Sequence, residues 1–139
     1  MLKYKNLSNP PFRFSFFMYL VALHSFIAGI GLMFLPSDLF TKLGYSAISE
    51  RFFTVQGGVF HIVMCIGYLM VAFRREKYEG VIYFSVTAKF IATFFLITYS
   101  IFIDWIWVVF LSGIFDFLIG LVIILLYKQH IKYLLSGDR

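Results

Sequence analysis

The chain has 139 residues, of which 61% are hydrophobic and only 14% are charged. This composition excludes an ordinary water-soluble domain, and four membrane spans of about 20 residues each would leave little room for a separate catalytic domain. The formal net charge is +5, but Lys and Arg gather at the ends of apolar runs, where such residues orient a membrane protein, so nucleic acid is not an expected partner.

Four apolar runs are each long enough to cross a hydrocarbon core of about 30 Å. They cover residues 14–35, 52–73, 80–102 and 105–127. Helices are expected because the backbone finds no water to bond to in lipid, and the runs are about twice as long as the strands of a membrane barrel. The sequence predicts an all-α fold, a four-transmembrane-helix antiparallel bundle that forms one integral membrane domain over residues 1–139.

The connections between these runs favour antiparallel neighbours because two of them are very short. Residues 74–79 form a charged turn, and only Ile103 and Asp104 separate the last two runs, with Asp104 placed to cap the fourth helix. The longer connection, residues 36–51, predicts a short helix that Ser37 caps and Gly44 ends. This short helix is expected at the membrane interface between helices 1 and 2.

The distribution of Lys and Arg predicts the orientation of the chain. Nine basic residues fall on one side of the predicted spans: Lys3, Lys5, Arg13, Arg74, Arg75, Lys77, Lys128, Lys132 and Arg139. The other side has only Lys42 and Arg51. We therefore expect a multi-pass membrane protein with a cytoplasmic N-terminus and a cytoplasmic C-terminus. We also expect His130 in the tail to be solvated.

Each predicted span carries one ionisable side chain near its centre: His24, His61, Lys89 and Asp116. Such groups cost a few kcal/mol each within a bilayer, and these four fall within a layer roughly 5 Å thick. Their helix faces are otherwise small or polar, as expected for faces that meet inside a bundle. The sequence predicts a ligand-binding cluster of these residues, extended on the second helix by Gln56 and Tyr68.

Structural explanations stand beside this prediction. Lys89 and Asp116 can form a buried ion pair that only fixes helix packing, and each histidine alone can bond a facing hydroxyl or carbonyl group. Gln56 can serve as an interhelical hydrogen-bonding residue, and Cys65, the only cysteine, as a small core residue. The common depth of the four ionisable groups favours a site, because independent structural solutions have little reason to align.

The cluster suits binding of a small polar or quinone-like headgroup, as expected of an accessory subunit of a membrane redox or lipid process. The alternatives are a proton-coupled small-solute transporter working as a homo-oligomer, and a structural membrane protein. Metal ligation by His24, His61, Cys65 and Asp116 has no recognised spacing, and haem between the two histidines is disfavoured by Lys89 and Asp116. No hydrolase or phosphate-loop motif occurs, so no catalytic residue, metal site or cofactor is assigned.

The start of the second helix reads Arg51-Phe52-Phe53-x-x-Gln56-Gly57-Gly58. Together with the length, the four spans and the small C-terminal tail, this segment resembles the small bacterial four-helix membrane proteins grouped as DoxX-like and related families. The resemblance implies the architecture and a bacterial inner membrane. It transfers no catalytic residue.

Overall fold

The computed structural model describes residues 10–46 and 50–136, and over these residues the chain is helical and contains no strand. The helices are α1 (Pro10–Phe34), α2 (Ser37–Lys42), α3 (Phe52–Arg74), α4 (Glu79–Phe102) and α5 (Trp107–Leu135). All except α2 are long and apolar enough to cross a membrane. The four predicted spans are therefore confirmed as helices.

Two of these helices extend beyond the predicted apolar runs. α1 begins at Pro10 instead of residue 14, because proline is well suited to the first turn of a helix, where a backbone N–H would have no partner. α5 continues to Leu135 instead of stopping near residue 127. Its last turns carry Lys128 and Lys132, so hydropathy marked the apolar part of the helix and not its end.

The predicted caps are wrong at two helix starts. Ile106 occupies the N-cap position of α5 without a side-chain bond, and Asp104 instead donates its backbone N–H to the Tyr99 carbonyl, 3.1 Å away, at the end of α4. Ser37 lies within α2, whose N-cap is Pro36. Gly44 does follow α2 with a φ of +96°, a conformation that glycine adopts without the strain other residues meet.

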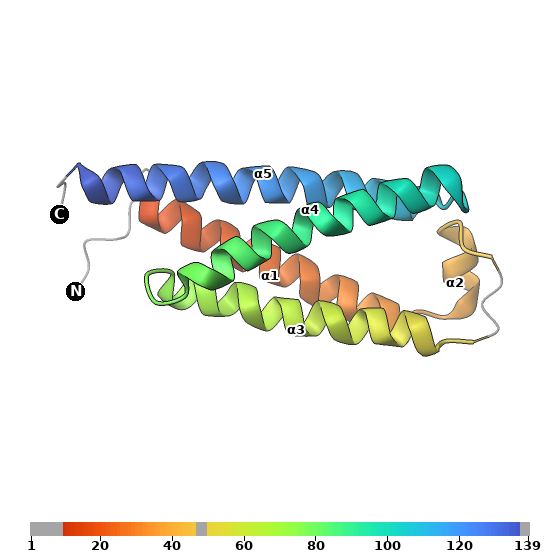
Figure 1. Cartoon of the computed structure of the whole chain (residues 1–139). Coiled ribbons are helices and arrows are strands. Elements are labelled where there is room, and N and C mark those ends of the chain that lie inside the picture. The colour runs from red at the N-terminus through yellow and green to blue at the C-terminus, as the bar shows by residue number, and fades with distance from the viewer. Residues whose placement is uncertain (1–9, 47–49, 137–139) are drawn as a thin grey trace.

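The long helices form two pairs, as Figure 1 shows. α1 packs closely on α3 and α4 packs closely on α5, whereas α1 with α5 and α3 with α4 make much less contact. The start of α1, the end of α5 and the α3–α4 connection lie together at one end of the molecule, which we call the terminal end. At the opposite end, the α2 end, the pairs diverge and α2 lies between them.

The α1–α3 pair depends on two glycines that bring the helix backbones into contact. A Cβ atom added at Gly58 would lie 2.7 Å from the Gly29 carbonyl oxygen, and one added at Gly29 would lie 2.9 Å from the Gly58 carbonyl oxygen. Small residues allow this close approach between helices in membrane proteins. Arg51 adds a second link, because its Nη2 donates to the carbonyls of Met33 and Leu35 at 3.0 and 2.9 Å.

The terminal end is tied across the two pairs by polar contacts. Arg75, in the α3–α4 connection, donates from Nη1 to Ser15 Oγ of α1 at 2.8 Å and from Nε to His130 Nε2 of α5 at 3.3 Å. His130 is only 2% exposed and stacks on Phe14, so the prediction that it is solvated was wrong. The contact with Arg75 supplies the polar partner that allows this histidine to be buried.

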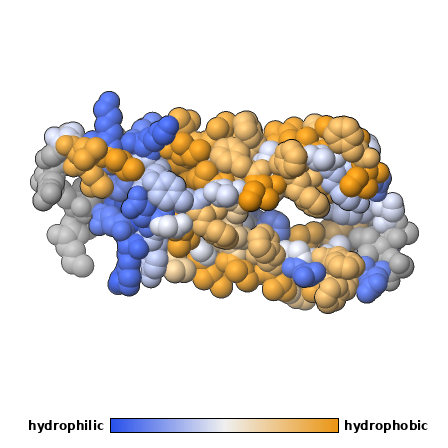
Figure 2. Space-filling view, in the orientation of Figure 1, coloured by the Kyte–Doolittle hydropathy of each residue, from blue (hydrophilic) through white to orange (hydrophobic). Residues whose placement is uncertain are grey.

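The buried core occupies the same half of the molecule, and the outer surface is apolar. The largest fully buried apolar side chains come from all four long helices: Phe14, Met18, Val21, Tyr68, Val71, Ile82 and Ile123. Outward-facing Phe, Ile and Leu residues cover the middle of the molecule, while hydrophilic residues gather at the terminal end (Figure 2). This pattern suits a helical bundle surrounded by lipid.

Candidate ligand-binding site between the helix pairs

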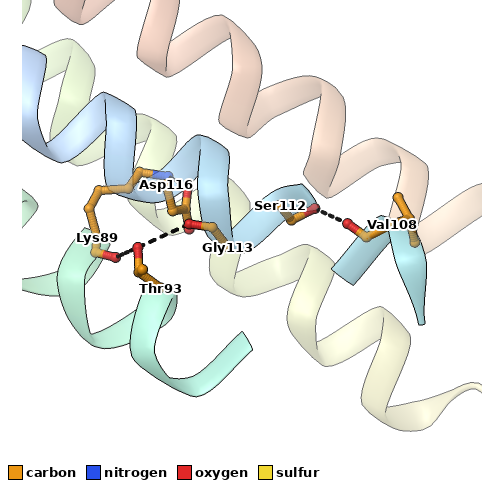
Figure 3. Close-up of polar contacts among 6 residues, drawn as sticks. All are labelled: Lys89, Thr93, Val108, Ser112, Gly113 and Asp116. Atoms are coloured by element: carbon orange, nitrogen blue, oxygen red, sulfur yellow. Dashed lines mark hydrogen bonds and ion pairs between the residues drawn. The ribbon is translucent and has the colours of Figure 1, made fainter. Parts of the chain in front are cut away.

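A buried ion pair joins α4 to α5 in the middle of the molecule. Lys89 Nζ contacts Asp116 Oδ1, as the close-up in Figure 3 shows, and the two residues are only 4% and 7% exposed. The Lys89 ammonium also lies 5.8 Å from the centre of the Tyr68 ring on α3, a distance at which the ring face attracts a cation. The predicted pairing of Lys89 with Asp116 is confirmed.

The surrounding backbone holds this pair in place. Thr93 Oγ1 lies 2.9 Å from the Lys89 carbonyl oxygen and 3.2 Å from the Gly113 carbonyl oxygen, so one hydroxyl sits between α4 and α5 (Figure 3). Gly113 permits the approach, because an added Cβ atom there would lie 2.9 Å from Ile97 Cγ1. The ion pair is therefore fixed on a closely packed helix pair.

A cavity of about 280 Å³, which we call the outer cavity, lies between the helix pairs toward the α2 end. Its polar lining comes from His24, Tyr45, His61, Ser112 and Asp116. The apolar wall includes Leu32, Leu35, Leu96 and Val108, and Phe40 and Leu43 close it on the side of α2. Burial raises the pKa of the Tyr45 phenol, so this group stays protonated and able to donate a hydrogen bond.

A second cavity of about 180 Å³, the inner cavity, lies next to the ion pair. His61, Leu96 and Asp116 line both cavities, so the two adjoin. The remaining polar lining is Ser25, Tyr68 and Lys89, and the apolar lining is Phe60, Met64, Ala88, Ala92 and Phe95. The Ser25 Oγ is buried, in a residue only 1% exposed, and has no hydrogen-bond partner among residues 10–46 and 50–136.

The structure brings together most of the residues that the sequence singles out. His24, His61, Lys89 and Asp116 come from four different helices. Both histidines line the outer cavity with Asp116, and His61 also lines the inner cavity with Lys89 and Asp116. The Tyr68 side chain joins them in the inner cavity. Gln56 does not: it is exposed on α3 and lines neither of the two cavities.

Ser25 and Tyr45 are polar residues of the cavities that the sequence did not single out. Ser25 follows His24 directly, but a serine in an apolar helix usually bonds to its own backbone and carries little information on its own. Tyr45 lies in the connection after α2, where periodicity gives no orientation. Only the assembly of the two helix pairs places them beside the histidines.

The chemistry of this site is that of hydrogen bonding within an apolar enclosure. Histidine, tyrosine and serine side chains can donate to or accept from a ligand, while Lys89 and Asp116 neutralise one another. In residues 10–46 and 50–136, no three His, Cys, Asp or Glu side chains lie together as a metal site would require. Comparison of the chain with protein-family models, curated proteins and solved structures gives no match.

Proposed function

We propose that this chain is a membrane-embedded binding protein for a small molecule with a polar, ring-sized headgroup such as a quinone. The observation that carries the proposal is the pair of adjoining cavities, whose walls are largely apolar but receive His24, His61, Lys89 and Asp116 from four helices. Ligand sites typically combine apolar walls with a few polar groups that fix orientation. Ionisable side chains in the apolar zone of a membrane protein typically mark such sites.

The proposed setting is a bacterial inner membrane with both termini in the cytoplasm, as the bias of basic residues and the DoxX-like resemblance suggest. The long helices would then cross the bilayer as an antiparallel bundle, and α2 would lie in the outer interface. Its exposed Asp38 and Lys42 and its buried Phe40 suit that position. His24, His61 and Asp116 would lie roughly 14 Å below the α2 end of their helices.

In this proposal the two histidines hold the headgroup and the ion pair shapes its surroundings. A neutral imidazole can donate one hydrogen bond, which suits the carbonyl oxygen of a quinone ring. Because Lys89 and Asp116 compensate each other, the site presents little net charge and favours a neutral headgroup over an ion. Tyr68 on α3 then forms an aromatic wall that faces the ion pair of α4 and α5.

Two other functions explain less of the geometry. A purely structural role accounts for the Lys89–Asp116 pair but leaves two cavities beside it, although protein interiors are normally close-packed. Proton-coupled transport requires access from both sides of the membrane. The contacts of Arg75 with Ser15 and His130 hold the terminal end together, which disfavours access from that end.

Binding of decylubiquinone to the purified protein in lipid nanodiscs tests the proposal. His24→Leu and His61→Leu each remove a headgroup contact, so each should weaken binding by about tenfold, equivalent to about 1.4 kcal/mol. Gln56→Leu is the matched control, because Gln56 lies on α3 but lines neither cavity, and it should bind like the wild type. Absence of saturable binding, or equal losses in all three variants, would overturn the proposal.

A further inference from the structure

The inner cavity lies where two consecutive helices separate. α3 and α4 are joined by a short turn, yet they make far less contact with each other than either makes with its own partner helix. α3 contributes Phe60, Met64 and Tyr68 to the cavity lining, and α4 contributes Ala88, Ala92 and Phe95. The cavity is therefore bounded on this side by the seam between two loosely packed helices.

The lining of the inner cavity reaches the outer surface of the bundle at this seam. Phe60 on α3 is 58% exposed and Phe95 on α4 is 61% exposed, although both line the cavity. Ala88 and Ala92 carry only methyl groups and leave the space between the helices unfilled. Figure 2 shows the same face hollowed between α3 and the α4–α5 pair, with hydrophilic surface between the apolar residues.

Ser25, a polar side chain with an unsatisfied hydroxyl group among the described residues, lies deep in this opening. Ser25 Oγ is buried against the inner cavity without a hydrogen-bond partner in the described part of the chain, and a buried hydroxyl in that state is unfavourable by about 1–3 kcal/mol. A headgroup that bonds Ser25 beside Lys89 would remove that penalty. The rim of the opening is aromatic and the floor is polar, so its occupant must be apolar at one end and polar at the other.

On the side of α2, the lining of the outer cavity is apolar and aromatic and includes Phe40, Leu43 and Tyr45. Phe40 itself is buried and its ring lies edge-on to Tyr45, with ring centres 5.3 Å apart. A water-soluble solute from the α2 end would pass this aromatic pair, whereas an amphiphile in the bilayer meets the α3–α4 seam directly.

We infer that the seam between Phe60 and Phe95 is a lateral portal through which a lipid-soluble ligand enters from the bilayer, leaving its apolar tail between α3 and α4. This inference rests on the proposed function and narrows the ligand to an amphiphile with a hydrogen-bonding headgroup and an apolar tail. The headgroup spans the two adjoining cavities, with His61, Ser25 and the Lys89–Asp116 pair in the inner one and His24 in the outer one. The tail passes between the two phenylalanine rings into lipid.

A tail-labelled photoprobe distinguishes this route from the alternatives. A ubiquinone analogue with a diazirine on its alkyl tail is irradiated with the protein in nanodiscs, with and without excess decylubiquinone, and labelled peptides are sequenced. Competed labels on α3 and α4 near Phe60 and Phe95 are expected. Competed labels on α2 and residues 35–45 would overturn the portal but keep the proposed function, and absence of any competed label would overturn both.

Paired substitutions on α4 give an independent test of the tail position. Ala92 lines the inner cavity, whereas its neighbour Ile91 is exposed on the outer surface and lines neither cavity. Ala92→Trp should reduce the ratio of decylubiquinone affinity to tail-less ubiquinone affinity by at least about tenfold. Ile91→Trp should leave that ratio unchanged. An unchanged ratio in folded Ala92→Trp protein would contradict passage of the tail between α3 and α4.

Discussion

The Lys89–Asp116 pair is the feature on which the middle of the bundle depends. Each residue alone would be a buried charge in an apolar region, and neither residue is more than 7% exposed. Together they form a neutral unit. The ring of Tyr68 lies beside its ammonium group, and Thr93 Oγ1 lies within hydrogen-bonding distance of the Lys89 and Gly113 backbone carbonyls. Such a pair adds little net stability compared with apolar residues of similar volume, but loss of one partner leaves the other uncompensated.

Lys89→Met and Asp116→Leu should each lower the free energy of unfolding in detergent by about 3–5 kcal/mol. The double variant should lose less than the sum of the two, because it leaves no unpaired charge. Asp38→Leu and Lys42→Met on α2 are the control pair, since both residues are exposed and should show small, additive effects. Additive losses at Lys89 and Asp116 would show that the two do not stabilise each other.

At the residue scale, the four ionisable residues could be selected from the sequence alone. Their selection needed only their charge and their position within each apolar run. Ionisable residues in apolar runs are few, so His24, His61, Lys89 and Asp116 stand out without knowledge of the packing. Gln56 could not be placed the same way, because its face depends on how α3 rotates against α1. His130 could not either, since its burial depends on Arg75, a residue 55 positions away in the chain.

At the scale of helices, the α1–α3 pair is held by backbone contact and by Arg51. Gly29 and Gly58 meet directly, and Arg51 satisfies two carbonyls at the end of α1 that would otherwise lack partners. The apolar runs predict that both helices exist. They do not predict which glycine meets which, because that depends on the relative rotation and translation of the two helices.

Gly29→Ala and Gly58→Ala should each destabilise the protein by about 1–3 kcal/mol, because the added methyl group forces the α1 and α3 backbones apart. Gly80→Ala is the control. An added Cβ atom at Gly80 meets no atom within 4 Å, and alanine is the better helix former. Thermal unfolding in detergent measures all three. Equal stability of Gly58→Ala and Gly80→Ala would show that the close contact is not required.

At the scale of the whole molecule, the two helix pairs are tied at one end and separated at the other. Arg75 links the α3–α4 connection to α1 and α5, which belong to different pairs. Within the α4–α5 pair, Tyr127 donates to Glu79 at 2.7 Å. The outer cavity occupies the other half, where the pairs diverge toward α2. Because the pairs are linked at the terminal end and separate toward α2, ligand-dependent movement is expected mainly at the α2 end.

The orientation of the chain in the membrane is testable without knowledge of the ligand. Both ends of the described chain and the α3–α4 connection lie at the terminal end, and α2 lies at the opposite end (Figure 1). The segments that form the terminal end also contain most of the Lys and Arg residues of the sequence. The helix arrangement and the charge distribution therefore predict the same orientation in the membrane. A green fluorescent protein fusion at the C-terminus should fluoresce, which requires a cytoplasmic location, and an alkaline phosphatase fusion there should be inactive.

Sandwich fusions of alkaline phosphatase then locate the connections. A fusion after Gly44 should be active, which requires export, and one after Lys77 should be inactive. Replacing Arg74, Arg75 and Lys77 with Gln tests whether positive charge sets the orientation. If it does, removing these charges should raise the fraction of inverted molecules. An active phosphatase at the C-terminus of the unaltered chain would reverse the orientation and would place the α2 end and both cavities toward the cytoplasm.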